Sequence, residues 1–266
     1  MASASVLLIG CGGHALSVLE ALGWKTPFYD ISGGAPEVGL RGGAPDSGLR
    51  GRTPDGDLRD GLPETPSFVN GITGCCPFKN IAIIDLPEKV GTSLFGVPVI
   101  GVDGDLATLR DAYSHAVVSL GSVGDWQKRE RLYRLAAAHN YAFPAIIHNK
   151  AYISSKSVCG FGLFAGIGAV VNAGCSVGDM CILNTGCIVE HKCEVGPFVH
   201  VAPGAVLCGG VRVGAGAHIG ANSVVLQGVH IGANSIIGAG SVVMRDVPDN
   251  FVALGNPCRI VREKTN

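Results

Sequence analysis

Two groups of residues in this chain of 266 residues have the side chains and the spacing to take part in binding or catalysis. The first is a glycine-rich turn, Gly10–His14, near the N-terminus. The second is a set of histidines in the C-terminal half: His191, His200, His218 and His230. An imidazole titrates near neutral pH and often serves as a general base. What these residues can do depends on the elements that position them.

The glycine-rich turn joins an expected strand, residues 6–9, to an expected apolar helix, residues 15–22. The free N–H groups and the dipole at the start of such a helix would bind an anion. Gly10, Gly12 and Ala15, with Asp30 twenty residues after Gly10, also satisfy a loose dinucleotide fingerprint. A nicotinamide dehydrogenase is therefore one interpretation. We favour a phosphate-binding turn of another sort, because no catalytic domain of the dehydrogenase class follows.

The C-terminal half contains an internal repeat of six residues. From Ile147 to Val243, seventeen apolar or small residues occur at every sixth position, and glycine directly follows many of them, as at Gly178 and Gly214. This period fits neither an α-helix nor a half-buried strand. It predicts a parallel β-helix in which three short strands and three turns make one coil of eighteen residues. The aliphatic residue points inward, and we expect the glycine to relieve the backbone at the adjacent turn.

A second row of small side chains lies four residues after the aliphatic positions. The interior of a three-sided helix is narrow, so this row must also point inward, and it explains most of the cysteines as small buried residues. Its members are Cys175, Cys181, Cys187, Cys193, Val199, Ala205, Val211, Ala217 and Ser223. We therefore expect reduced thiols and no bound metal, although the chain has ten cysteines.

The same register places the four histidines outside the coil. His191 lies two residues after the inward Val189, and each of the other three directly precedes an inward residue. None is therefore expected to be a satisfied core histidine. For His218 and His230 we favour a plain surface position or a contact between subunits.

The N-terminal part is expected to be a compact Rossmann-like βαβ domain. Strands are expected at residues 81–85, 97–100 and 116–120, and helices at 105–113 and 125–140. Residues 33–68 interrupt it with four nonapeptides, each with proline at its fourth position and an acid next. Their composition favours an extended surface loop or disorder. A cover over a neighbouring subunit or over the sugar pocket is the alternative.

Charge and hydropathy argue against a nucleic-acid-binding protein and against a membrane protein. The 20 basic and 21 acidic residues nearly cancel, so no surface for nucleic acid or for a membrane is indicated. No run approaches the roughly 20 apolar residues of a membrane span, and residues 6–9 are too short for the core of a signal peptide. We expect a cytoplasmic protein.

Several motifs, taken in their order, resemble one family. They are the turn Gly12-Gly13-His14, the triplet Ile146-Ile147-His148, the segments Asn184–Cys193 and Phe198–Gly204, and the closing Gly255-Asn256-Pro257. Each alone is weak, but their order is similar to that in the sialic-acid O-acetyltransferases and nucleotide-sugar 4-amino N-acetyltransferases. The resemblance covers nearly the whole chain except the nonapeptides. It implies a left-handed hexapeptide β-helix that generally forms trimers.

The resemblance also implies roles for particular residues. His191 would be the general base, oriented by Glu190, by Asn184 or by a backbone carbonyl, because Lys192 stands where the family often has an acid. Gly209, eighteen residues after His191 and so one strand spacing away, would offer its N–H to the oxyanion. Acetyl-CoA would lie along His200, Gly220, Ala221, Gly238 and Ala239. The nucleotide-linked sugar would contact Gly10, Gly12, Gly13, His14, Asp30, Gly121 and Arg129.

These expectations combine into one hypothesis. Residues 1–145 would bind the nucleotide-sugar, residues 146–247 would form the acetyltransferase β-helix, and residues 248–266 would cap it. The reaction would be acetyl-CoA-dependent N-acetylation of a 4-amino-deoxy sugar linked to UDP, GDP or dTDP, in a homotrimer with its sites between subunits. An O-acetyltransferase acting on a sialic-acid-like sugar has the same fold and base. A non-catalytic binding scaffold is the alternative from another class.

Overall fold

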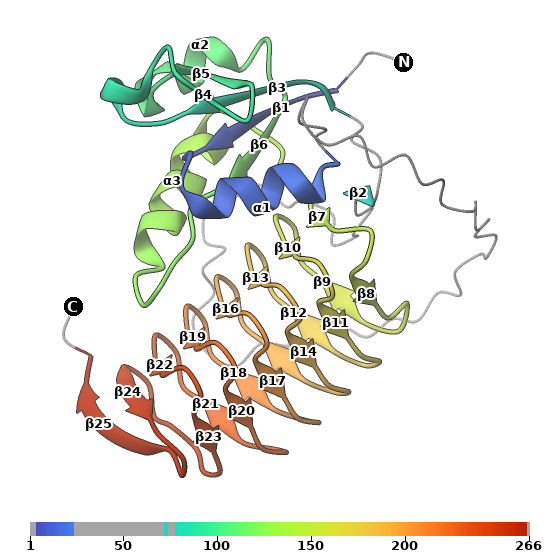
Figure 1. Ribbon diagram of the computed structural model, residues 1–266, viewed down its shortest axis with the longest axis vertical. Helices are drawn as coiled ribbons and strands as arrows, with labels where there is room; N and C mark the ends of the chain where they lie inside the picture. The colour runs from blue at the N-terminus through green and yellow to red at the C-terminus, as the bar shows by residue number, and fades with distance from the viewer. Residues whose placement is uncertain (1–3, 24–71, 74–77, 265–266) are drawn as a thin grey trace.

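The computed structural model describes residues 4–23, 72–73 and 78–264. An α/β domain comes first and lies along one side of a long parallel β-helix (Figure 1). Asp30 and the nonapeptide segment 33–68 lie outside the described residues, so the expectations about them stay predictions.

The α/β domain is built on a sheet with the strand order β4-β5-β3-β1-β6. The strands are β1 (Ala4–Ile9), β3 (Phe78–Ile84), β4 (Ser93–Leu94), β5 (Val97–Gly101) and β6 (His115–Val118). Strands β5, β3, β1 and β6 run parallel, and β4 pairs antiparallel with β5. The helical segments are α1 (Gly13–Ala21), α2 (Leu106–Leu109) and α3 (Gln127–Ala138), with 3₁₀ turns at Pro87–Lys89 and Asp103–Asp105.

Helices cover both faces of this sheet, which explains why residues 6–9 of β1 are all apolar. Val6 and Leu8 pack with residues of α1 in one buried cluster. Leu7 and Ile9 pack on the other side with Tyr133 of α3. The sheet is therefore a layer between helices, as a Rossmann-like domain requires.

The β-helix has three faces, each a parallel stack of short strands joined by turns. Face 1 contains β2 (Ile72–Thr73), β7 (Ile146–Ile147), β10 (Phe164–Ala165), β13 (Ile182–Leu183), β16 (His200–Val201), β19 (His218–Ile219), β22 (Ile236–Ile237) and β24 (Phe251–Leu254), and β25 (Arg259–Glu263) closes it antiparallel to β24. Face 2 contains β8 (Tyr152–Ile153), β11 (Val170–Val171), β14 (Ile188–Val189), β17 (Val206–Leu207), β20 (Val224–Val225) and β23 (Val242–Val243). Face 3 contains β9 (Val158–Cys159), β12 (Ser176–Val177), β15 (Glu194–Val195), β18 (Arg212–Val213) and β21 (His230–Ile231).

The predicted period of six is confirmed. Residues eighteen apart pair in register, for example Ile188 with Val206 and Val206 with Val224. The aliphatic row and the small row fill one continuous core. The cysteines of the small row are buried and free, and burial raises the pKa of Cys181, Cys187 and Cys193 to about 12. These thiols are packing groups that stay protonated.

The reason given for the repeated glycines was wrong in part. The left-handed backbone position recurs at every sixth residue from Gly162 to Gly240, three residues after each aliphatic position, and not at the glycines that directly follow them. Those glycines are needed because the next coil passes close by. A β-carbon on Gly214 would stand 2.4 Å from the nitrogen of Ala233, and one on Gly178 would stand 2.6 Å from that of Pro197.

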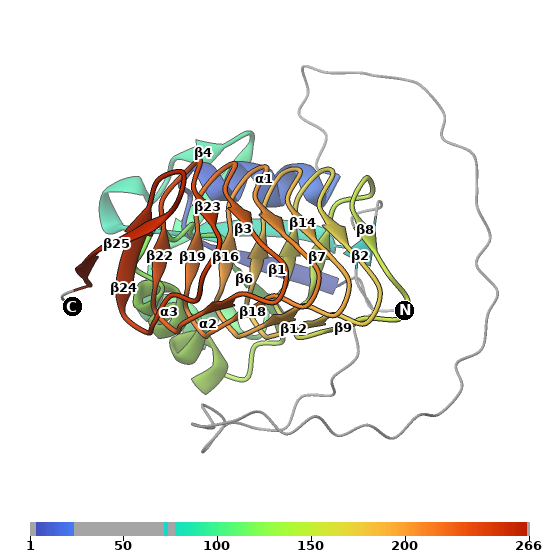
Figure 2. The ribbon, with the colours of Figure 1, turned by 90° about the horizontal axis from the view of Figure 1, so that it is seen from below.

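The α/β domain docks on the outer side of face 1, and Figure 2 shows it lying along the length of the β-helix. Outward residues of face 1, Phe164 and Ile182, belong to the same buried cluster as α1. Near the other end, the Trp126 Nε1 donates to Asn234 Oδ1 at 3.1 Å. The docking fixes the position of the loop after β6 relative to the β-helix.

The outer sides of the other two faces differ in chemistry. The outward residues of face 3 are exposed, and Glu194, Arg212 and His230 among them are polar. The outward residues of face 2 form an apolar row that is only partly buried: Val170, Ile188, Val206, Val224 and Val242. A row of this kind along a whole face is typical of a contact surface. In the part of the chain that the structure describes, no helix has the length and apolar character of a membrane span.

Candidate functional site

His191 lies in the turn after β14, on the edge where face 2 meets face 3, and its ring rests on Gly209 of the next coil. A β-carbon on Gly209 would stand 2.6 Å from both Nε2 and Cε1 of His191. The Gly210 N–H donates to the carbonyl of His191 at 2.9 Å, which ties the two turns together. Any side chain at position 209 would therefore displace the imidazole.

Glu190 lies on the other side of the imidazole. Its Oε2 is 3.4 Å from His191 Nδ1 and accepts the backbone N–H of His191 at 3.3 Å. The side chains of His191 and Glu190 are 60% and 38% exposed, so this contact is open to water. The geometry directs Nδ1 toward the carboxylate and leaves Nε2 beside Gly209. Lys192 follows with a left-handed backbone, φ 59°.

Asn184 lies elsewhere, on the edge where face 1 meets face 2. Its Oδ1 accepts the N–H of Thr185 at 2.8 Å, and its Nδ2 is 3.4 Å from Nε2 of His200. Within one chain no contact joins it to His191, so its orienting role, which would need a neighbouring copy, stays a prediction.

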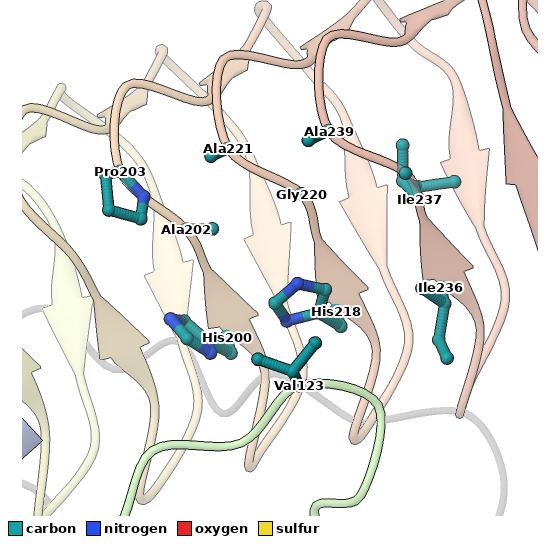
Figure 3. Close-up of a pocket in the computed structure, with 11 residues that line it drawn as sticks. Val123, His200, Ala202, Pro203, His218, Gly220, Ala221, Ile236, Ile237 and Ala239 are labelled. Atoms are coloured by element: carbon teal, nitrogen blue, oxygen red, sulfur yellow. The ribbon is translucent and has the colours of Figure 1, made fainter. Parts of the chain in front are cut away.

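The five residues predicted to bind the cofactor lie together around a groove of about 390 Å³ on this second edge. The groove is lined by Val123, His200, Ala202, Pro203, His218, Gly220, Ala221, Ile236, Ile237, Gly238 and Ala239 (Figure 3). Its floor consists of small residues from successive coils, which leave room for an extended ligand. The assignment of this groove to acetyl-CoA stays a prediction.

His200 and His218 point out of the coil as predicted, but both are buried, which corrects the plain surface position that was one expectation for His218. They are 7% and 8% exposed, because the loop after β6 covers them. The Nδ1 of His200 donates to the carbonyl of Ser122 at 2.5 Å. Burial lowers the pKa of His200 to about 4, so its imidazole is neutral. The repeat register could show that these residues leave the core, but not that another domain covers them.

Most residues predicted to bind the nucleotide-sugar meet at the carboxyl ends of β1 and β6. Gly10 adopts φ 98°, and a β-carbon on Gly121 would stand 3.6 Å from that of His14. Gly12 precedes α1 and provides no side-chain cap, so the first N–H groups of the helix are open to a ligand.

His14 of this turn lies against the β-helix, partly buried. Its ring packs edge-on against Phe164 of the β-helix, with centroids 4.6 Å apart. Burial, and then the electrostatic influence of Arg129 and His200, lower the pKa of His14 to about 3. His14 is thus a neutral group and offers no positive charge to a phosphate.

Arg129 was wrongly placed among the substrate residues. It is 2% exposed, and it donates from Nη2 to the carbonyl of Met180 in the β-helix at 2.5 Å. Its guanidinium lies over the ring of Phe198, 6.0 Å from the centroid. These contacts make it part of the seam between the two domains, out of reach of a ligand.

Asp85 is a residue that the sequence reasoning missed. It directly follows β3, the neighbour of β1, which is where a dinucleotide-binding fold carries its ribose-binding acid. Its carboxylate accepts the N–H of Cys11 at 2.5 Å and that of Leu86 at 2.7 Å, and Lys89 lies 3.3 Å away. The role had been given to Asp30, because the usual spacing of about 20 residues ignores the nonapeptide insertion. The signal was present, since the strand expected at 81–85 ends in this acid.

Among the described residues, no group of three or more His, Cys, Asp or Glu side chains is arranged to hold a metal ion.

Comparisons with known proteins show which family the chain resembles. The profile of the family "Bacterial transferase hexapeptide (six repeats)" matches residues 210–245. A perosamine N-acetyltransferase from Caulobacter crescentus, crystallised as a histidine-to-asparagine mutant with CoA and GDP-perosamine, is 31% identical, with 98% of this chain and 99% of that chain covered and a TM-score of 0.73. PerB from Caulobacter crescentus, also in complex with CoA and GDP-perosamine, is 32% identical at a TM-score of 0.72, with 98% and 99% covered.

A third solved structure is more distant. The acetyltransferase domain of PglB from Neisseria gonorrhoeae, in complex with acetyl coenzyme A, is 27% identical, with 97% of this chain and 98% of that chain covered and a TM-score of 0.72. No curated protein sequence matches this chain. Because the match to the Caulobacter enzymes spans both domains at more than 30% identity, the chain belongs to the family of hexapeptide-repeat sugar acetyltransferases, which combine a Rossmann-like domain with a left-handed β-helix.

Proposed function

We propose that this chain transfers the acetyl group of acetyl-CoA to the amino group of an amino sugar carried by a nucleoside diphosphate. The observation that carries the proposal is the match, at 31% and 32% identity over 98% of the chain, to an N-acetyltransferase crystallised with CoA and GDP-perosamine. The closeness of His191 to Gly209 supports the proposal, because it places a possible general base beside a backbone N–H donor.

The proposed step is a direct attack. His191 Nε2 takes a proton from the amine as the nitrogen attacks the thioester carbonyl. The C–N bond forms, and the resulting oxyanion accepts the Gly209 N–H, which has no acceptor among the described residues. Collapse of the intermediate breaks the C–S bond, and the proton on His191 passes to the leaving thiolate. The products are the acetylated amine and CoA.

We assign the groove on the edge between faces 1 and 2 to acetyl-CoA, and the glycine turn with Asp85 to the nucleotide. The small floor of the groove suits the narrow pantetheine arm. The open N-terminus of α1 suits a phosphate, and Asp85 suits a ribose hydroxyl.

The active site is proposed to form between copies of the chain, as a homotrimer. His191 lies on the edge between faces 2 and 3, whereas the groove lies on the edge between faces 1 and 2, so the full width of face 2 separates them. A copy rotated about an axis parallel to the β-helix keeps each coil at the same height. Its His191 would then approach the end of the groove that His200 occupies. The apolar outer row of face 2 supports such a contact.

The test is thiol release from acetyl-CoA with a panel of UDP-, GDP- and dTDP-linked amino sugars beside their hydroxyl counterparts. Turnover with an amino sugar, lost in His191→Asn and kept in His230→Asn on the exposed face 3, is the expected result. His230 controls for the loss of a surface imidazole. Turnover with the hydroxyl sugars alone would replace N- by O-acetylation. Binding of CoA with no transfer to any acceptor would point to a scaffold and overturn the proposal.

A further inference from the structure

His218 is the outward residue of β19, and the proposed chemistry does not use it. It lines the groove next to His200, one coil further along face 1, with ring centroids 4.9 Å apart and the planes nearly perpendicular at 78°. With 8% of its surface exposed, it lies under the loop after β6, and Val123 of that loop is beside it in Figure 3. Packing against His200 and the loop fixes the orientation of the ring.

The two ring nitrogens of His218 have different surroundings. Nδ1 is fully buried and makes no hydrogen bond within the described residues. Burial lowers the pKa of His218, while the nearby carbonyl of Ser122 raises it. A neutral imidazole has one N–H and one acceptor nitrogen, and with Nδ1 enclosed the open nitrogen of the ring is Nε2. Figure 3 shows one ring nitrogen turned toward the side of the groove where Gly220 lies, so a ligand in the groove could pair with Nε2.

The surroundings of Nε2 define what it can bind. The groove is otherwise lined by hydrocarbon and backbone, from Val123, Ala202, Pro203, Ile236 and their neighbours. An acceptor in such a groove selects a ligand that brings an N–H donor on an otherwise apolar chain. His200 is less available for this, because its Nε2 already faces the amide of Asn184 at 3.4 Å. The unoccupied acceptor along the groove is therefore that of His218.

We propose that His218 is a second histidine that positions acetyl-CoA, by accepting with Nε2 an amide N–H of the pantetheine arm. The inference rests on the proposed function, because it takes the groove as the cofactor site. The pantetheine arm contains two secondary amides between methylene groups, which is the chemistry that the groove selects. His218 lies one coil beyond His200, about 4.8 Å further from the end where the proposal puts the thioester. It acts on the arm and not on the reacting atoms.

The test compares two ligands on the full-length protein by calorimetry. CoA carries the pantetheine arm, and adenosine 3′,5′-bisphosphate does not. His218→Phe keeps a buried ring and removes the acceptor. It should weaken CoA binding about 3- to 10-fold, the range for one neutral hydrogen bond, and leave the bisphosphate unchanged. In turnover, the KM for acetyl-CoA should rise while kcat stays within about two-fold.

A matched pair separates the acceptor from packing. His218→Gln places an amide oxygen near the position of Nε2 and should recover much of the affinity, whereas the shorter His218→Asn should not. His230→Phe on the exposed face 3 is the control for an added aromatic ring. Equal CoA affinity in the wild type, the Phe variant and the Asn variant, or an equal loss for both ligands, overturns the inference alone. A wild type that binds no CoA overturns the proposed function with it.

Discussion

The imidazole of His191 occupies the space that a side chain at Gly209 would need. A β-carbon there would lie 2.6 Å from Nε2 and from Cε1, well inside van der Waals contact. The two residues are eighteen apart and therefore meet only because the chain completes one coil between them. One missing side chain thus sets the ring position and also leaves the Gly209 N–H beside it.

The first prediction is that Gly209→Ala lowers kcat about 100-fold or more. The methyl group would push the imidazole aside by about 1 Å, and displacements of that size cost about two orders of magnitude in rate. The KM values for both substrates should change little, because neither proposed binding region includes position 209. Steady-state kinetics with the preferred amino sugar measures this.

Gly104→Ala is the control for this substitution, since a β-carbon there would meet only the distant Val102 side chain at 4.0 Å. It should leave kcat unchanged. Near-normal turnover of Gly209→Ala would show that catalysis does not need the close packing of His191 on position 209. That result would contradict the assignment of His191 as the base.

The second prediction concerns Asp85. Its burial raises the pKa of the carboxyl, but the hydrogen bonds from Cys11 and Leu86 and the contact with Lys89 outweigh burial and lower the pKa to about 2 from 3.8. Because the folded pKa is the lower one, ionised Asp85 stabilises the fold above pH ~4, and this stabilisation is lost as the pH falls toward 2. Asp85→Asn should cost about 2 kcal/mol of unfolding free energy at pH 7. It should also raise the KM for the nucleotide-sugar and spare that for acetyl-CoA.

Denaturant unfolding of Asp85→Asn and wild type between pH 3 and pH 7 measures the stability part. The difference between the two should narrow toward pH 3. A constant difference would mean that the charge of Asp85 is not what stabilises the glycine turn. A rise in both KM values together would argue against a nucleotide contact.

The β-helix was predictable from the sequence, because its cause is local. Each coil repeats the same contacts, so the inward rows of Val177 and Cys175 can be counted from the period alone. The detailed reason for each glycine was less accessible. The close approach at Gly214 depends on the distance between coils, which the period does not give.

Contacts between the domains could not be predicted from the period. His218 was expected at the surface or in a contact between subunits, and Arg129 at the sugar, yet both are buried where the α/β domain meets face 1. Their burial depends on how two separately folded parts dock, and no local pattern encodes that. Asp85 is intermediate, since its strand was predicted but the order of strands in the sheet was needed to identify its place.

The third prediction is that Lys192→Asn stabilises the protein by about 0.5–1 kcal/mol. Lys192 has a left-handed backbone, φ 59°, a conformation that costs an ordinary residue energy and that asparagine tolerates better. Glycine or asparagine occupies most equivalent turns, for example Gly210 and Asn222. The shift in Tm relative to the wild type measures the gain.

The turnover of Lys192→Asn tests whether the charge of Lys192 contributes to the reaction. If its charge has no part in the reaction, Lys192→Asn keeps kcat within about two-fold. A fall of more than ten-fold, with the stability gain intact, would show that the ammonium group next to His191 contributes to turnover.

The fourth prediction tests whether the site forms between copies. His191→Asn should remove the proposed base on the edge between faces 2 and 3. Ala221→Trp should fill the groove on the edge between faces 1 and 2. Each variant alone should be inactive. After dissociation and reassembly of an equal mixture, some junctions pair an intact groove with an intact His191, and activity should return to roughly a quarter of wild type, because two independent halves are each intact half of the time. Native mass spectrometry confirms the mixed oligomer, because His191→Asn lowers and Ala221→Trp raises the mass of the chain. No recovery of activity in such an oligomer would mean that both halves of a site come from one chain. In that arrangement a ligand would have to span the full width of face 2.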